Sequence, residues 1–411
     1  MLGRRGEILR KFALVCYATV LLSGEILALT WPEAVARAAL VSNDIKSAQK
    51  QLESSRWSYY KAYGSFLPQV SANMSGGTSA STPQSFAYGL SASLPLFKGL
   101  ANYFNLQSAN LNYQSDAAGL KAAEASAYYS LRSAFIDLLS AQENSKVQEK
   151  ILASRRQNSK MVKLLYEGGT EDKGNYLKTQ TQVFEAEYNL SAAKRTLELA
   201  GFRLAQLLEV EVTSVEGGAV GALENSADYK SLMLNTPAYQ QAKFQLDLAD
   251  LNQKATLSEF LPSISLSASY SRSDTIWPPA NSSKSLSLSL SYPLFPGGTN
   301  IADRFIYGAR LDQAREDFAK SEKDLLFDIR DAYISYKNAL ESNAVQQSYL
   351  QASLERAKIA QVKYLNGLIS YNEWDQIQNE YVSYQKSIIT SNKARWLAAA
   401  NWHKSYGGWV K

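Results

Sequence analysis

The chain has 411 residues, of which 45% are apolar and 20% are charged, and its formal net charge at pH 7 is +5. This length allows two or three domains of ordinary size, and so small a positive excess argues against a nucleic-acid partner. Cys16 is the only cysteine and His403 the only histidine. One histidine alone makes neither a catalytic triad nor a metal site. With no phosphate-binding or dinucleotide-binding motif, the sequence predicts no enzyme, no cofactor and no bound metal.

Residues 1–28 have the pattern of a secretory signal peptide. Four basic residues between positions 4 and 11 precede the apolar run FALVCYATVLLSG, which is too short to cross a bilayer. The alternative is a cytosolic amphipathic N-terminus. Removal near Ala28 leaves a mature chain without cysteine, and therefore without disulfides. Cys16 lacks the small-residue context of a lipidation site, so we expect no acyl anchor.

The remainder of the chain contains two similar halves. SFLPQVSANMS, starting at Ser65, resembles EFLPSISLSAS, starting at Glu259, and YEGGT resembles YLNGL. Tyr166 and Tyr364 are 198 residues apart, as are Pro95 and Pro293. A repeat of this length indicates two copies of one structural unit. We predict a first repeat over 29–210, a linker over 211–228 and a second repeat over 229–411.

Each repeat predicts long helices. There is no proline between Pro95 and Pro237, and none after Pro296, so neither stretch contains the residue that breaks helices. A 3-4-3 apolar spacing typical of a coiled-coil seam occurs once in each stretch: Tyr128, Leu131, Phe135 and Leu138, and Leu326, Ile329, Tyr333 and Tyr336. We predict helices over Asn102–Tyr166 and Asn300–Tyr364, each about 100 Å long at 1.5 Å per residue.

Shorter helices are expected on either side of the long ones. Two of them, Trp31–Gly64 and Pro237–Glu259, come first in their repeats, and Pro32 and Pro237 suit a first helical turn. The other two, Gly174–Glu209 and Asn372–Lys404, return after the turns YEGGT and YLNGL.

Strands precede each long helix. In SLSLSLSY, the residues Leu286, Leu288, Leu290 and Tyr292 alternate with serines, so one face is apolar and the other is small and polar. Three further stretches alternate in the same way. Their apolar faces are Val70, Ala72 and Met74; Phe86, Tyr88, Leu90, Ala92, Leu94 and Leu96; and Ile264, Leu266, Ala268 and Tyr270.

Such strands suit a soluble sandwich or a membrane barrel. No further amphipathic strands exist to complete a sandwich, so we favour the membrane, with Leu90, Leu94, Leu266, Leu286, Leu288 and Leu290 facing lipid. Four strands leave two open edges, which are costly in lipid, so other copies of the chain must close the sheet. Two copies give eight strands and three give twelve; the serine-rich face favours the wider, wet barrel.

At these residues the chain resembles the TolC-like outer-membrane efflux protein family. The resemblance rests on LTWPEAVARAALVSNDIKSA, FLPQVSANMS, FLPSISLSAS, LPLFKG, YPLFPGG and the two tip sequences, and it covers essentially the whole mature chain. It implies a membrane α+β fold. Three copies, each giving four strands, would form a twelve-stranded barrel that continues as a helical periplasmic tunnel in a Gram-negative cell. Expected partners are a periplasmic adaptor and, indirectly, an inner-membrane pump.

The resemblance also places an entrance at the helical tips. It implies that Tyr166, Gly168, Gly169, Tyr364, Asn366 and Gly367 contact the adaptor, and that Glu171, Asp172, Glu373 and Asp375 are candidate entrance acids. In some relatives an arginine locks the second tip, but here Ile369 stands at that position, and Gln376 stands where a gate aspartate would be. Alternatively, the four acids are solvated turn residues.

The sequence therefore predicts a passive exit duct of a tripartite efflux or type I secretion system. The alternatives are a periplasmic coiled-coil scaffold without a channel and a self-sufficient porin. The long helices argue against the porin.

Overall fold

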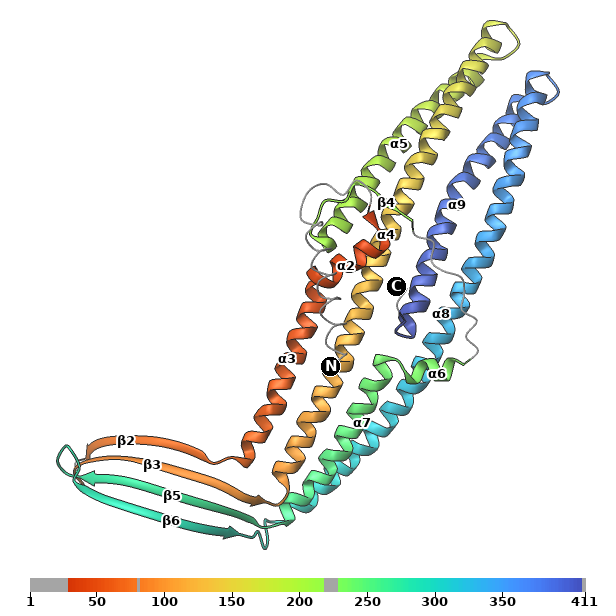
Figure 1. Cartoon of the computed structure of the whole chain (residues 1–411). Helices are drawn as coiled ribbons and strands as arrows, with labels where there is room; N and C mark the ends of the chain where they lie inside the picture. Colours follow the sequence, from red (N-terminus) through yellow and green to blue (C-terminus); the bar gives the residue numbers. More distant parts are fainter. Residues whose placement is uncertain (1–28, 80–81, 218–227, 409–411) are drawn as a thin grey trace, which may run out of the picture. The chain divides into compact units, whose positions relative to one another are not determined.

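The computed structural model describes residues 29–79, 82–217 and 228–408 (Figure 1). The predicted signal peptide and most of the predicted linker lie outside the described residues. The chain divides into two compact units. Of the described residues, one unit comprises 29–43, 125–217 and 330–408, and the other comprises 44–79, 82–124 and 228–329. Each unit thus takes segments from both predicted repeats.

Two helices of equal length dominate the chain. Helix α4 covers Ala101–Glu167 and α8 covers Thr299–Leu365, each with 67 residues. The sequence predicted both to within one residue at each end. None of the described helices combines the length and the apolarity of a membrane span.

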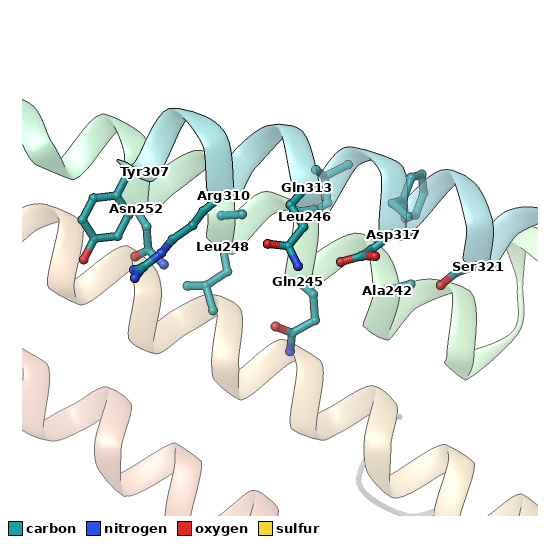
Figure 2. A pocket seen from close by; sticks show the side chains of 13 residues that line it. Ala242, Gln245, Leu246, Leu248, Asn252, Tyr307, Arg310, Gln313, Asp317 and Ser321 are labelled. Carbon is teal, nitrogen blue, oxygen red and sulfur yellow. The ribbon is translucent and has the colours of Figure 1, made fainter. Parts of the chain in front are cut away.

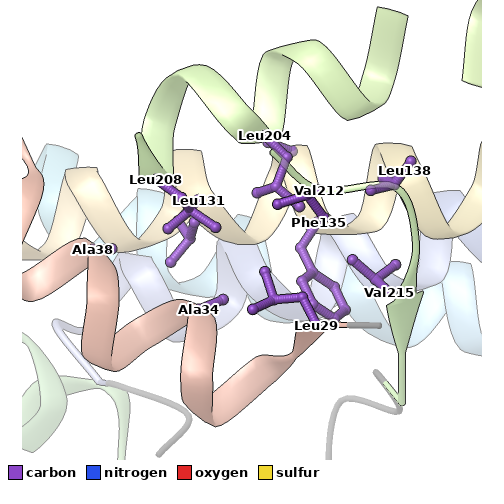
Figure 3. Packing of buried hydrophobic residues seen from close by; sticks show 11 residues of the cluster. Leu29, Ala34, Ala38, Leu131, Phe135, Leu138, Leu204, Leu208, Val212 and Val215 are labelled. Atoms are coloured by element: carbon purple, nitrogen blue, oxygen red, sulfur yellow. The ribbon is translucent and has the colours of Figure 1, made fainter. Parts of the chain in front are cut away.

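The first unit contains α2 (Trp31–Val41), α5 (Lys173–Leu208), α9 (Tyr371–Ser405) and the C-terminal parts of α4 and α8. Its main core surrounds Phe135, which is fully buried (Figure 3). The predicted seam residues Leu131 and Leu138 lie in this core with Leu204 and Leu208 of α5. A short parallel pair of strands, β1 (Leu29–Thr30) and β4 (Val215–Glu216), adds Leu29 and Val215. Two-residue strands carry no alternation, so the sequence did not indicate them.

The second unit contains α3 (Asn43–Tyr63), α6 (Tyr229–Leu234), α7 (Pro237–Ala255) and the N-terminal parts of α4 and α8. The prediction of one continuous helix over Trp31–Gly64 was wrong, because the backbone leaves the helical region at Ser42. Ser42 and Asn43 have side chains that compete for backbone hydrogen bonds, which favours a break. Thr236 caps α7 by accepting the N–H of Tyr239 at 3.1 Å. Short 3-10 turns, Gly64–Phe66 and Thr256–Phe260, follow α3 and α7.

Four strands form one antiparallel sheet in this unit. They are β2 (Gln69–Ser79), β3 (Thr82–Lys98), β5 (Ser263–Asp274) and β6 (Asn281–Ser291), in the order β2-β3-β5-β6. Leu266 lies opposite both Leu94 and Leu288, so the apolar faces of the strands coincide. The register shifts between Pro95 and Phe97, and Phe97 lies opposite Ile264. The prediction that Leu96 continues the apolar face is therefore corrected, since a bulge changes the alternation there.

The other face of the sheet is a ladder of serines. Ser269 and Ser285 lie opposite each other with their hydroxyl oxygens 2.8 Å apart, as do those of Ser71 and Ser91. In the described part of the chain, β2 pairs only with β3 and β6 only with β5. Both outer edges of the sheet are consequently open, and Leu288 on its apolar face is 67% exposed.

Candidate functional site at the hairpin tips

Each long helix ends in a turn with the same backbone. Gly169 and Gly367 have φ of +75° and +71°, which glycine adopts without strain. The N–H of Thr170 bonds to the carbonyl of Leu165, and the N–H of Leu368 bonds to that of Lys363, both at 2.9 Å. This pairing satisfies carbonyls at the end of a helix. The predicted tip glycines are thus placed at positions that require them.

The returning helices begin with equivalent caps. Asp172 accepts the N–H of Asn175 at 2.8 Å, and Ser370 accepts the N–H of Glu373 at 3.3 Å. An acceptor side chain at this position satisfies an otherwise unpaired N–H, and a carboxylate also favours the positive end of the helix dipole. Asp172 and Glu373 are both exposed. Asp172 therefore caps a helix besides any role at an entrance, while the carboxylate of Glu373 lies in the first turn of α9, at the positive end of its dipole.

The second tip is built on a buried aromatic cluster. Trp374 is 1% exposed and stacks on Tyr364 with the ring centroids 4.8 Å apart. Tyr371 packs against both rings, and Val162 of α4 joins them in the core. The indole N–H donates to Gln361 at 2.9 Å. This cluster joins the end of the first hairpin, α4–α5, to that of the second, α8–α9.

One hydrogen bond links the two tips directly. The hydroxyl of Tyr364 donates to Glu171 at 2.5 Å. Burial, followed by the hydrogen bond to Glu171, raises the pKa of Tyr364 above the ordinary tyrosine value. Tyr166 has no such role: its ring stacks on Tyr176 at 5.7 Å, and it is 37% exposed.

Asp375 lies inside the hairpin pair rather than on its surface. It is 3% exposed, pairs with Lys178 at 2.7 Å and accepts the side-chain amide of Gln182 at 2.7 Å. Arg155 of α4 reaches Gln182 at 3.4 Å and Asn379 of α9 at 2.5 Å. Burial lowers the pKa of Arg155, while Asp375 opposes that shift. This polar network and the aromatic cluster together hold α4 and α5 to α8 and α9.

Of the predicted site residues, the structure brings Tyr364 and Glu171 together, while Gly168 and Asn366 lie exposed in their turns. Five residues of this site were not among those predicted from the sequence: Tyr371, Trp374, Lys178, Gln182 and Arg155. A signal was present for two of these, because Tyr371, Trp374 and Ile377 recur at helical spacing. The polar partners of Asp375 carried no such signal.

A groove of about 440 Å³ lies between α7 and α8 in the second unit (Figure 2). Its lining mixes leucine and alanine with polar side chains, and Arg310 and Asp317 lie on α8 about two turns apart. A mixed lining of this kind is ordinary for a groove between two packed helices. Within the described ranges, no three His, Cys, Asp or Glu side chains are grouped to hold a metal ion.

Comparisons with known proteins agree with this architecture. The sequence profile of a family described as outer membrane efflux protein matches residues 34–209 and 229–408. The probable outer membrane lipoprotein SilC of Salmonella typhimurium is 24% identical over 399 residues, which cover 90% of this chain and 84% of SilC. The outer membrane efflux protein BepC of Brucella suis is 22% identical over 357 residues, 81% of this chain and 77% of BepC.

Solved structures share the fold at low identity. The outer membrane protein VceC of Vibrio cholerae superposes with a TM-score of 0.80 at 16% identity, covering 92% of this chain and 96% of VceC. The MtrE outer membrane channel of Neisseria gonorrhoeae, in its open state, superposes with a TM-score of 0.79 at 18% identity, covering 92% and 89%.

Proposed function

The chain belongs to the outer membrane efflux protein family, and on this premise we propose that three copies of it form the exit duct of a tripartite efflux or type I secretion system. Membership of the family sets aside the alternative of a periplasmic scaffold without a channel.

The observation that carries the proposal is the open sheet. Unpaired backbone groups at both edges would each cost several kcal/mol in lipid, and the described chain supplies no strand to cover them. Pairing β6 of one copy with β2 of the next satisfies both edges. Three copies close twelve strands, with the leucine face towards lipid and the serine ladder towards a wet lumen.

The helices continue the duct into the periplasm, and the hairpin tips form its entrance. The turns at Gly168–Gly169 and Asn366–Gly367, with Tyr166, meet a periplasmic adaptor, which links the duct to an inner-membrane pump. The chain has no nucleotide-binding motif, so transport through it is passive. Glu171, Asp172 and Glu373 lie at the tips, where threefold repetition makes rings of acid that favour cations. Asp375 reaches the lumen only if its bonds to Lys178 and Gln182 break.

Disulfide cross-linking tests the assembly. Because the only cysteine lies in the predicted signal peptide, engineered cysteines report without background. Asn73→Cys in β2 is combined in turn with cysteine at Ser283, Ser285, Ser287 or Ser289 of β6. Within one chain β2 and β6 are separated by two strands, about 14 Å, which is too far for a disulfide. One combination should therefore yield covalent trimers on non-reducing gels, and single-cysteine variants should not. A monodisperse monomer for every combination would contradict the proposal.

A charge on either face of β6 tests which side meets lipid. Leu286→Arg, opposite Ala268 in the middle of the apolar band, should cost about 2–4 kcal/mol near the bilayer centre and impair insertion. Ser287→Arg, one residue away on the opposite face, should insert normally because its side chain meets water. Equal outer-membrane recovery of both variants would refute the assignment of the faces.

A further inference from the structure

The apolar face of the sheet changes character towards the loops that join β2 to β3 and β5 to β6. Residues that lie opposite one another on neighbouring strands form rows across this face. Near the helices these rows are aliphatic, as in Leu94, Leu266 and Leu288. Towards the loops, one row places Leu90 beside Tyr270 and Lys284. The next row places Tyr88 beside Arg272. Two cations thus stand on the face that we assign to lipid.

Aromatic rings lie beside these cations. The Nε of Arg272 donates to the hydroxyl of Tyr270 at 3.1 Å, and the Nζ of Lys284 lies 5.9 Å from the centre of the same ring. Trp277, in the loop, packs edge-on to Phe86 and Tyr88 with centroids about 6 Å away. Aromatic rings and basic residues together are typical of the border between hydrocarbon and headgroups.

The spacing along the strand agrees with that border. Ile264 and Arg272 are eight residues apart on β5, about 27 Å along the strand at 3.4 Å per residue. At a strand tilt of about 35–45° this is a rise of about 19–22 Å, and the apolar band of an outer-membrane barrel is about 25 Å tall. If Ile264 marks the periplasmic side of the band, Arg272 therefore lies within a few ångströms of its outer border, a distance that the long arginine side chain spans.

The two cations have no acidic partner among the residues that the structure describes. In the described residues, neither Arg272 nor Lys284 forms an ion pair with a carboxylate. The nearby acid, Asp274, accepts hydrogen bonds from Thr275, Ala280 and Asn281 within the loop. An open hollow of about 760 Å³ lies on this face, and its lining includes Val70, Leu90, Ala268, Tyr270, Arg272 and Lys284. The hollow therefore offers apolar walls with two cations.

We propose that this hollow binds a phosphate-bearing lipid of the outer leaflet. The fork of the Arg272 guanidinium and the Lys284 ammonium hold the phosphate, and Leu90, Val70 and Ala268 contact the first part of an acyl chain. The inference rests on the proposed function, because it requires this face to meet lipid. It adds a specific lipid site to a face otherwise expected to meet hydrocarbon without preference.

Native mass spectrometry of the full mature protein in detergent tests the site. The probes are phosphatidic acid and phosphatidylcholine with identical acyl chains, which differ in the exposure and charge of the phosphate. We expect up to three molecules of phosphatidic acid per trimer, bound about tenfold more tightly than phosphatidylcholine. Arg272→Gln with Lys284→Gln should remove that preference, and Arg272→Lys with Lys284→Arg should largely retain it. Lys243→Gln, at an exposed position on α7, is the matched control and should behave as wild type.

Three results would overturn the site: no preference in the wild type, an undiminished preference in the double glutamine variant, or displacement of the lipid by inorganic phosphate at a similar concentration, which would indicate a site for a free anion. Should the double variant fail to assemble, the wild type decides, because a preference that depends on charge must fall at high salt. A trimer without lipid preference refutes only the lipid site, whereas a monomer refutes the proposed function.

Discussion

The two hairpin tips have the same backbone but use their side chains differently. Gly169 and Gly367 are 198 residues apart and adopt the same left-handed conformation. Yet Tyr364 is 7% exposed, and its counterpart Tyr166 is 37% exposed. The turn is fixed by local hydrogen bonds, which both sequences supply. The side-chain environment depends on what packs against each turn: Tyr364, Tyr371 and Trp374 of the second tip are buried between the hairpins, whereas Tyr176 of the first tip is only partly buried against them.

The residues that follow the turns also differ between the two tips in what their side chains contact. Trp374 and Asp375 of the second tip correspond in the repeat to Tyr176 and Leu177 of the first. The first hairpin contributes Glu171, Lys178 and Gln182, and the second contributes the groups that they bind. The two hairpins therefore share one backbone, but they carry different side chains that bind each other. Paired substitutions at corresponding positions can test this asymmetry.

The largest difference is expected from the aromatic pair. Trp374→Ala removes a fully buried indole and its bond to Gln361, and should lower the free energy of local unfolding at the second tip by about 3–5 kcal/mol. Tyr176→Ala removes a partly buried ring that stacks on Tyr166, packs against the edge of the aromatic cluster and accepts the side-chain amide of Gln180, and should cost about 1–2 kcal/mol. Amide hydrogen exchange in the assembled protein measures both. Equal losses would show that the two tips are packed alike.

A smaller difference is expected at the next position. Asp375→Asn keeps an acceptor for Gln182 but removes the ion pair with Lys178. We expect a loss of about 1–2 kcal/mol, since the carboxylate is buried but Lys178 is half-exposed and screened by water. The matched Leu177→Asn, at an exposed site, should change local stability by less than about 0.5 kcal/mol. Unchanged exchange rates at the second tip in Asp375→Asn would contradict a structural role for this carboxylate.

Tyr364→Phe should lower the free energy of local unfolding at the tips by about 1 kcal/mol more than Tyr166→Phe does. Tyr364→Phe loses the hydrogen bond to Glu171, whereas Tyr166→Phe loses no bond between the hairpins. The effect has a pH dependence. Because burial and Glu171 raise the pKa of Tyr364, its stabilising contribution is complete below the ordinary tyrosine pKa of about 10 and is lost as the pH rises above it.

Limited proteolysis of the tips across this alkaline range provides the measurement. Burial raises the pKa of Tyr371 in the same direction, so Tyr364→Phe should reduce the alkaline opening without abolishing it. Tyr166→Phe should follow the wild-type profile. Equal rates of opening in wild type and Tyr364→Phe at every pH would contradict a role for the Tyr364 hydroxyl in the alkaline opening.

Alanine substitutions at the two tip glycines should lower the local stability of their turns equally. An added Cβ at Gly169 or Gly367 meets no atom within 4 Å, so alanine costs only the conformational penalty of positive φ. We expect about 1 kcal/mol for Gly169→Ala and the same for Gly367→Ala. Hydrogen exchange at the ends of α4 and α8 measures both. A marked inequality would mean that the turns are not equivalent.

Much of the fold could be predicted because its signals are local. The two proline-free stretches located α4 and α8, and the serine–leucine alternation located β6 and the face to which Leu288 belongs. The predictions failed where the backbone conformation of a single residue departs from the regular pattern around it. This happens at the helix break at Ser42 and at the bulge near Leu96. The β1–β4 pair joins residues nearly 190 positions apart in so short a register that no periodicity indicates it.

For the candidate site, the sequence by itself determined the turns, because a glycine at positive φ and a capping side chain act within a few residues. It also determined that tyrosines and acids gather there. Only the tertiary structure decided that Tyr364 binds Glu171 and that Asp375 is buried beside Lys178. These contacts join residues almost 200 positions apart, and burial and pairing depend on which helix faces come together, which no local pattern specifies.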